Sequence, residues 1–279
     1  MIIVDFKQVL FATFFAAVKQ HTNAVIELPV IRTMSLNMLR NIRKKFPDHD
    51  VVVASDSVSN WRRDYFPNYK ARRRIKRSDS DVDWTSIFES MDVVRQEISE
   101  NFPYTHIQIE GCEADDIIGT IVHHTKVSPV IIISADKDFK QLQTYSNVTQ
   151  YDHIKGRWIK AENPYELLHE HILRGDVDDD VPNILSEDDT FVVDGKRQVP
   201  LTKKRIEMLQ NVQNDENHKY YRNWIRNKTL IDLSMTPEHL RNKIIEAFEK
   251  GPMVKDRSKL YGYITKNRLS SLLENINDF

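Results

Sequence analysis

The chain has 279 residues, with 40 lysines and arginines against 41 aspartates and glutamates, so its net charge is near zero. Its seven glycines are too widely spaced to form a glycine-rich phosphate loop. A single cysteine excludes a disulfide framework or a multi-cysteine metal site and fits a reducing, cytoplasmic compartment. The apolar-looking run Val9–Val18 is too short to span a bilayer, and the N-terminus does not resemble a signal peptide.

Short runs of β-branched residues predict strands that are buried on both faces of a largely parallel sheet. These runs are Ile2–Val4, Val51–Ala54 and Val130–Ile133, and Thr105–Ile109 predicts a further strand. Helical periodicity separates them, for example over Val30–Phe46. This alternation predicts an α/β fold with a mostly parallel central sheet flanked by helices.

The second part of the chain has a different, more helical pattern. Asn163 is suited to cap a helix that runs to Arg174 and ends at Gly175. Beyond it, polar helical segments such as Lys203–Gln213 and Pro237–Glu249 dominate. We therefore predict a core over residues 1–175 and a smaller, mostly helical part over residues 176–279.

Aspartates follow three of the predicted strands, and two further acidic clusters join them. Because ligands bind at the carboxyl edge of an open parallel sheet, we expect these side chains to converge. Taken singly, each aspartate could be a helix cap or a solvated turn residue. The eight candidate metal ligands are Asp5, Asp56, Glu113, Asp115, Asp136, Asp138, Asp176 and Asp179.

Eight carboxylates in one cleft would repel one another without a counter-charge. Hard divalent cations with oxygen ligands remove that repulsion, and Mg²⁺ is the natural choice, with Mn²⁺ able to substitute. Two ions about 4 Å apart support the in-line attack of water on a phosphodiester. The acids therefore predict a two-metal site.

The segment Trp61–Arg77 holds eight basic residues and four interleaved aromatic residues. Basic side chains bind phosphates and aromatic rings such as Tyr65 and Phe66 stack on unpaired bases, although a solvated loop or a nuclear-localisation cluster has the same composition. The acidic stretch Ser78–Asp83 predicts a flexible loop through which the chain returns from the basic segment, the acidic return. The candidate nucleic-acid contacts are Arg62, Arg63, Tyr69, Arg72, Arg74, Lys76 and Arg77.

Six motifs together resemble the 5′ nucleases, also called flap endonucleases, and within them the ribonuclease H type of T-even phages. The resemblance covers nearly the whole chain. The motifs, in the family's order, are Ile3-Val-Asp5-Phe, Ala54-Ser-Asp56, Tyr69-Lys-Ala-Arg-Arg73, Glu113-Ala-Asp-Asp116, Ser134-Ala-Asp-Lys-Asp138-Phe and Gly175-Asp-Val-Asp-Asp179.

The resemblance implies a PIN-like core with a helical arch at about residues 61–90, through which a single-stranded 5′ end passes. It assigns the first five candidate acids, Asp5 to Asp136, to one metal and the last three to a second, with Asp116 supporting its neighbours. Lys70 and Arg73 match the catalytic basic pair that grips the scissile phosphate. The family's helix–hairpin–helix is altered here, because Leu185–Val199 contains only Gly195.

The activity implied is a metal-dependent 5′ to 3′ nuclease that removes RNA primers and 5′ flaps in lagging-strand replication. The implied substrates are DNA with 5′ flaps and RNA–DNA hybrids, and the candidate partners are a single-stranded DNA-binding protein and a sliding clamp. We expect a monomer without membrane contact, in the host cytoplasm if the chain is phage-encoded. A shorter PIN-type endoribonuclease and an inactive structure-specific DNA-binding protein are the alternatives.

Three other features receive a structural interpretation. His169 and His171 are two positions apart, so they cannot face each other on a helix as a metal pair. Cys112 reads as a small buried residue. The helically spaced Leu272, Leu273, Ile276 and Phe279 predict core packing, with a docking surface for a replication partner as the alternative.

Overall fold

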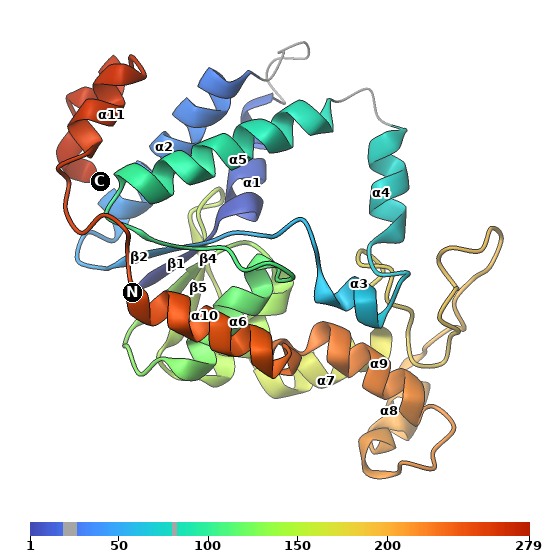
Figure 1. The fold of residues 1–279 in the computed structure, drawn as a ribbon. Helices are drawn as coiled ribbons and strands as arrows, with labels where there is room; N and C mark the ends of the chain where they lie inside the picture. The colour runs from blue at the N-terminus through green and yellow to red at the C-terminus, as the bar shows by residue number, and fades with distance from the viewer. Residues whose placement is uncertain (19–26, 80–82) are drawn as a thin grey trace.

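The computed structural model describes residues 1–18, 27–79 and 83–279. Within them, a six-stranded sheet has the order β3-β2-β1-β4-β5-β6 (Figure 1). All neighbouring strands are parallel except β6, which is antiparallel to β5, so the predicted mostly parallel sheet is confirmed. The strands are β1 (Ile2–Asp5), β2 (Val51–Ala54), β3 (Thr105–Ile107), β4 (Val130–Ile133), β5 (Val148–Asp152) and β6 (Arg157–Ile159).

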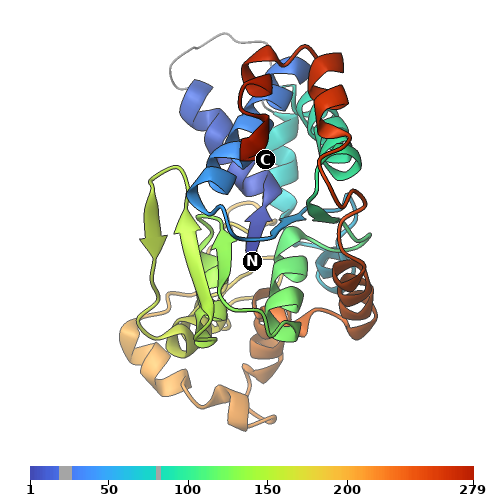
Figure 2. The same ribbon diagram turned by 90° about the vertical axis from the view of Figure 1, so that its left-hand side faces the viewer.

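Helices cover both faces of this sheet and extend beyond one end of it (Figures 1 and 2). The α-helices are α1 (Phe6–Val18), α2 (Leu28–Lys45), α3 (Trp61–Tyr65), α4 (Ala71–Ser78), α5 (Trp84–Asn101), α6 (Ala114–His124), α7 (Pro164–Arg174), α8 (Lys203–Leu209), α9 (Tyr221–Ile231), α10 (Glu238–Lys250), α11 (Leu260–Lys266) and α12 (Ser270–Leu273). Short 3₁₀ helices are η1 (Lys137–Thr144), η2 (Val212–Asn214), η3 (Leu233–Met235) and η4 (Ile276–Asp278).

The strand order places a topological switch point between β1 and β4. From β1 the chain builds outward through β2 to β3, and it then returns to add β4 on the other side of β1. The connections on the two sides therefore diverge at the carboxyl ends of β1 and β4, which is where open α/β sheets bind ligands. Asp5 is the last residue of β1, at this point.

Alternate residues of the central strands supply two separate hydrophobic cores. Ile2 and Val4 pack with α1, α2 and α5, whereas Ile3 packs with α6 and α10 on the opposite face. Burial on both faces explains why these strands read as continuous apolar runs. The sheet is thus a rigid platform whose carboxyl edge is free to present polar side chains.

The C-terminal residues return to the core and do not form one separate body. A third hydrophobic cluster joins α7, α8 and α9 to Phe66 and Tyr69, but α10 packs on α6 and the chain end packs beside α2. Leu272 and Phe279 are buried, and Leu273 and Ile276 are partly buried against the same core. The predicted core packing of the chain end is confirmed for Leu272 and Phe279.

Element boundaries follow the expected signals in most places. Helix α7 begins after Asn163, whose side chain accepts a hydrogen bond from the Glu166 amide, and it ends at Gly175 as predicted. Helix α2 begins at Leu28 rather than Val30. Proline is tolerated in the first turn, because the backbone amides there have no hydrogen-bond partner within the helix. Strand β3 ends at Ile107 and α8 ends at Leu209, both earlier than predicted.

Two segments stand apart from the packed core. Between α7 and α8, the described residues Pro182 to Thr202 form neither helix nor strand, in keeping with an altered hairpin. Helix α4 stands away from the sheet and buries none of its residues (Figure 1). Of the predicted acidic return, residues 80–82 lie outside the described residues.

Among the described parts of the chain, no helix is long and apolar enough to cross a membrane.

Candidate active site

Five of the eight predicted acids line one cavity at the carboxyl edge of the sheet. Its volume is about 380 Å³. Asp5 ends β1, and Asp56 and Asp136 follow β2 and β4 within three residues, so the fold delivers them to the same place. Glu113 and Asp115 come from the start of α6, where the helix dipole favours carboxylates. The expected convergence of these five residues is therefore what the fold produces.

Neighbouring groups fix the orientation of these carboxylates. Asp5 accepts a hydrogen bond from the Ser134 hydroxyl (3.0 Å). Asp56 accepts one from the Ala114 amide (2.8 Å) and forms an ion pair with Lys7 (2.8 Å). Gln150 is fully buried in β5, and its amide group donates to the Ser134 and Asp136 carbonyls at 3.0 and 2.6 Å. The loop that carries Asp136 is thus held from the neighbouring strand.

The remaining three acids lie beside the first five. Asp138, Asp176 and Asp179 line a small adjoining hollow together with Asp115, which also lines the main cavity. Asp115 therefore connects the two groups of acids.

Crowding of carboxylates changes their acidity. Burial and the neighbouring Asp56 and Asp136 raise the pKa of Asp5 to about 7. Burial and the neighbouring Asp136 likewise raise the pKa of Asp138 to about 7, and burial with Asp136 and Asp5 raises that of Asp115. A divalent cation would remove the repulsion that these shifts report.

The donor set also fits divalent metal ions. Every acid in the two hollows offers oxygen, the ligand that hard cations prefer. Asp138 has a buried carboxylate oxygen, Oδ1, for which no hydrogen-bond partner exists among the described residues. Such an orphaned atom is costly to bury unless a further group, such as a cation, satisfies it.

Lys70 and Arg73 connect the two acid groups from the start of α4. The Lys70 ammonium lies 2.6 Å from Glu113 and 3.5 Å from Asp179, and the Arg73 guanidinium lies 2.6 Å from Asp179. Burial opposes the charge on Lys70, but Glu113 outweighs it and raises its pKa well above the usual range. Burial also opposes the charge on Glu113, yet Lys70 and Arg62 lower its pKa to about 2. Both groups therefore stay ionised.

Several members of the basic segment face the cavity or solvent. Arg63, Arg74 and Arg77 line the cavity, and Lys76 is exposed on α4. The Arg77 guanidinium lies over the Phe88 ring, 5.2 Å from its centroid. Arg72 is held more tightly, because it pairs with Asp180 and stacks on Phe191 at 4.4 Å. These contacts of Arg72 hold the start of α4 in place, so its guanidinium is not simply a free charge for phosphate binding.

Three predictions about this segment are wrong. Arg62 is only 2% exposed, and it pairs with Asp116 (2.9 Å) instead of reaching a phosphate. Tyr69 is buried, and its hydroxyl lies 2.9 Å from both Glu113 and Asp179, so it cannot stack on a base. Phe66 is buried in the third hydrophobic cluster. A basic, aromatic run does not show which of its members turn inward.

Asp116 supports its neighbours, as predicted. It is fully buried in α6 and accepts hydrogen bonds from the Trp61 indole (3.1 Å), the Thr236 hydroxyl (2.8 Å) and the Glu113 amide (2.9 Å). With Arg62 it forms a buried network that links α3 and α6 to the segment after α9. This network fixes the base of the basic segment against the acid-bearing helix.

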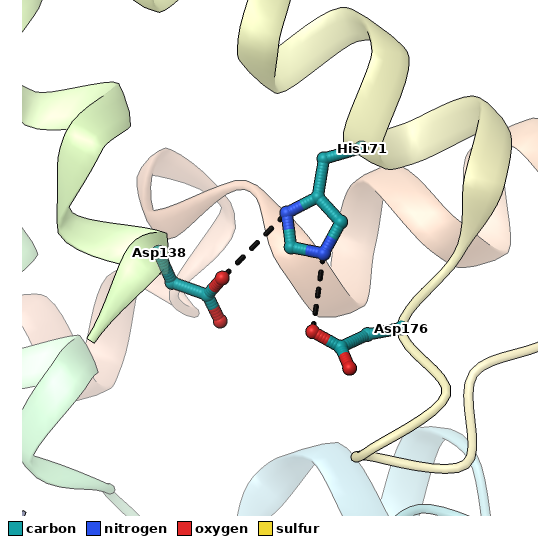
Figure 3. Close-up of side chains that lie close together, drawn as sticks. All are labelled: Asp138, His171 and Asp176. Carbon is teal, nitrogen blue, oxygen red and sulfur yellow. Dashed lines mark hydrogen bonds and ion pairs between the residues drawn. The ribbon is translucent and has the colours of Figure 1, made fainter. Parts of the chain in front are cut away.

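Sequence reasoning missed three residues of the site. Lys7 follows the end of β1 by two positions and pairs with Asp56, and Gln150 supports the Asp136 loop. His171 contacts two of the acids, Asp138 and Asp176 (Figure 3). The spacing correctly excludes a pair of histidines, but it does not reveal the contacts of His171, because its partners come from other segments. Cys112 is buried as predicted, and burial raises the pKa of its thiol to about 12.

Acids that converge at a sheet edge beneath a basic helix form the kind of site at which a phosphodiester can be cleaved with the help of metal ions. Residues 1–170 match the family model of the 5′–3′ exonuclease N-terminal resolvase-like domain, and residues 166–279 match that of the T4 RNase H C-terminal region. The chain belongs to the 5′–3′ exonuclease family and is a phosphodiester hydrolase of the 5′ to 3′ nuclease type.

Relatives and solved structures agree with this membership. Ribonuclease H of Enterobacteria phage T4 is 29% identical, with 99% of this chain and 95% of that protein covered. A 5′-3′ exonuclease of Buchnera aphidicola is 26% identical over 66% of this chain and 65% of that protein. The D15 flap endonuclease of bacteriophage T5, solved with DNA and metal ions, has the same fold, with a TM-score of 0.62, 17% identity, and 89% of this chain and 97% of that chain covered.

Proposed function

We propose that this nuclease uses Mg²⁺ to remove RNA primers and 5′ flaps during lagging-strand DNA replication. The observation that carries the proposal is the shared cavity, in which five acids of the sheet edge face basic side chains of α4. Acids alone would repel a phosphodiester backbone. Acids with bound cations, next to a row of arginines, can attract and cleave it.

The two acid groups would hold two ions. Asp5, Asp56, Glu113, Asp115 and Asp136 surround the first position, and Asp138, Asp176 and Asp179 surround the second. Bound there, Mg²⁺ would lower the pKa of water and stabilise charge on the attacking and leaving oxygens. Mn²⁺ would be an alternative ion, since it accepts the same ligands.

Lys70 and Arg73 would bind the scissile phosphate. The Lys70 ammonium has three N–H donors and directs one of them to Glu113 at 2.6 Å. The ammonium also lies 3.5 Å from Asp179, and Arg73 pairs with Asp179 and donates to the Asp178 carbonyl. The N–H groups of Lys70 and Arg73 that these contacts leave free would donate to phosphate oxygens as negative charge grows on them. Because the ion pairs with Glu113 and Asp179 orient both side chains beforehand, little reorganisation is needed at the moment of reaction.

Helix α4 would guide the single strand. Five of its eight residues are basic, and none of the eight is buried, so the helix is not held in place by a core of its own. A flexible single strand can follow such a helix and bend into the cavity at its base, and the basic side chains would bind its phosphates. The residues beyond Gly175 would hold the adjoining duplex, which places the scissile phosphate at the junction. A PIN-type endoribonuclease lacks both this helix and the second acid group.

The test is a comparison of two flapped duplexes, one with a 5′ flap and one with a 3′ flap, each labelled on the flap strand. With Mg²⁺, we expect short fragments from the 5′ side and little cutting of the 3′ flap. Asp136→Asn provides the matched control, since the amide preserves shape but cannot offset cation charge. It should bind the flap at least as tightly as the natural protein and leave it uncut. Preferential removal of the 3′ flap would overturn the proposal.

We also expect a monomer that acts in the cytoplasm, in that of the host if a phage encodes it. A single-stranded DNA-binding protein and a sliding clamp are its candidate replication partners. Sedimentation of the purified chain, alone and with each partner, tests these expectations. A stable dimer in the absence of DNA would contradict the first of them.

A further inference from the structure

His171 lies inside the second acid group, on the last turn of α7. Its Nε2 atom is 3.1 Å from Asp176, and its Nδ1 atom is 3.6 Å from Asp138. Figure 3 shows the imidazole between the two carboxylates, with one ring nitrogen directed at each. One ligand atom from each of the three residues lies within 4.8 Å of the others. The three side chains come from α7, η1 and the loop after α7, so the fold brings them together.

The two carboxylates differ in how many hydrogen-bond and ion-pair partners they have besides the imidazole. Asp176 has other partners, because it pairs with Lys137 at 3.0 Å and accepts a hydrogen bond from the Asp178 amide at 2.9 Å. Asp138 has the buried Oδ1 atom for which the described residues offer no hydrogen bond. The facing Nδ1 atom of His171, at 3.6 Å, is too far away to donate one. The imidazole therefore does not serve Asp138 as a hydrogen-bond donor.

The separation suits a shared metal ion better than a hydrogen bond. Metal–nitrogen and metal–oxygen bonds of about 2.0–2.2 Å allow two ligand atoms 3.6 Å apart to bind one ion. We propose that His171 is a ligand of the second metal position through its Nδ1 atom, together with Asp138 and Asp176, while Nε2 keeps its hydrogen bond with Asp176, and that this position prefers Mn²⁺ to Mg²⁺. The proposal rests on the metal-dependent nuclease function proposed above.

The preference follows from the ligand types. Mg²⁺ is bound almost entirely by oxygen and gives up its water reluctantly, whereas first-row transition ions accept imidazole nitrogen. The first group, Asp5, Asp56, Glu113, Asp115 and Asp136, offers only oxygen. The second offers nitrogen and oxygen. The two positions should therefore differ in metal selectivity, with a larger preference for Mn²⁺ over Mg²⁺ at the second position than at the first.

Pulsed electron paramagnetic resonance of Mn²⁺ bound to the metal-stripped full chain tests the proposal. A ¹⁴N coupling from imidazole should appear in the natural protein and vanish in His171→Gln, where the affinity of one Mn²⁺ should fall by about tenfold or more. His169→Gln is the matched control, because it makes the same change on the same helix outside the cluster. It should keep both the coupling and the affinity. Labelling the natural protein with [¹⁵N]histidine should convert the coupling to that of ¹⁵N, and this result needs no variant to fold.

The outcomes separate this inference from the proposed function. If the natural protein binds Mn²⁺ without nitrogen coupling, or if the coupling survives in His171→Gln, His171 is an ion-pair partner only and the inference is overturned. Cleavage of a 5′ flap with Mg²⁺ is measured on the same preparation. Cleavage without nitrogen coupling refutes the inference alone, whereas nitrogen coupling without cleavage refutes the proposed function alone.

Discussion

The buried pair of Arg62 and Asp116 offers the sharpest test of how the basic segment is held. Arg62 is 2% exposed and Asp116 is fully buried, with 2.9 Å between their charged groups. Arg62 also donates a hydrogen bond to the Leu230 carbonyl at 2.9 Å. Arg62→Ala would remove these interactions and leave the Asp116 carboxylate buried without its strongest counter-charge.

The expected loss is large for a single substitution. Removing one partner of a buried ion pair costs about 3–5 kcal/mol, because the other charge stays buried and unpaired. For a chain of 279 residues, this corresponds to a fall in melting temperature of about 5–8 °C. Urea denaturation and calorimetry of the purified protein measure both quantities.

Two further variants make the reasoning refutable. Arg62→Ala combined with Asp116→Asn should be more stable than Arg62→Ala alone, because the amide carries no uncompensated charge. Arg63→Ala, the neighbouring arginine that lines the cavity, should change stability by less than about 0.5 kcal/mol but lower the salt dependence of DNA binding by about one phosphate contact. A loss below about 1 kcal/mol in Arg62→Ala, or a double variant no more stable than the single one, would refute the account.

Three other predictions follow from the site. Lys70→Ala and Arg73→Ala should each lower the single-turnover cleavage rate by about 10²–10³ while weakening DNA binding much less; tenfold weaker binding with an unchanged chemical step would show that they act only by attraction. Because the pKa values of Asp5 and Asp138 are raised to about 7, both carry protons for much of the time at pH 6.5. Mg²⁺ should displace these protons, so calorimetry in buffers of different ionisation enthalpy should detect more proton release at pH 6.5 than at pH 8.5, and equal release at both would contradict the shifts. Gly175→Ala should destabilise the turn that carries the second acid group, because φ is +68° and an added Cβ would overlap the Val181 carbonyl oxygen; an unchanged melting temperature would contradict this.

The sheet and its acids could be predicted because both depend on local patterns. Buried parallel strands read as β-branched runs, and the acid after each run must lie at the carboxyl edge whatever the details of packing. Strands β5 and β6 escaped prediction because their residues are partly polar. Gln150, for example, is buried only because its amide satisfies carbonyls of the β4 loop. That requirement belongs to the tertiary structure and leaves no periodic signal.

The inward-facing members of the basic segment could not be predicted for the same reason. Arg62 and Arg63 are adjacent and chemically identical, yet one pairs with a buried aspartate and the other lines the cavity. Only the position of Asp116, which comes from α6, separates their roles. His171 likewise gains its role from Asp138 and Asp176 on other segments. Charge and spacing within one stretch of sequence therefore locate a site better than they assign its individual members.

The most direct test of the central claim maps the products from one end-labelled 5′-flap substrate. The natural protein is incubated with Mg²⁺, or with a chelator, and the ends of the released fragments are sequenced. We predict cuts that cluster at the junction of single strand and duplex, fragments released from the 5′ side, and no products with the chelator. Cuts spread through the duplex, release from the 3′ side, or undiminished cleavage without divalent metal would contradict the claim that the acids and α4 form a metal-dependent 5′ nuclease site.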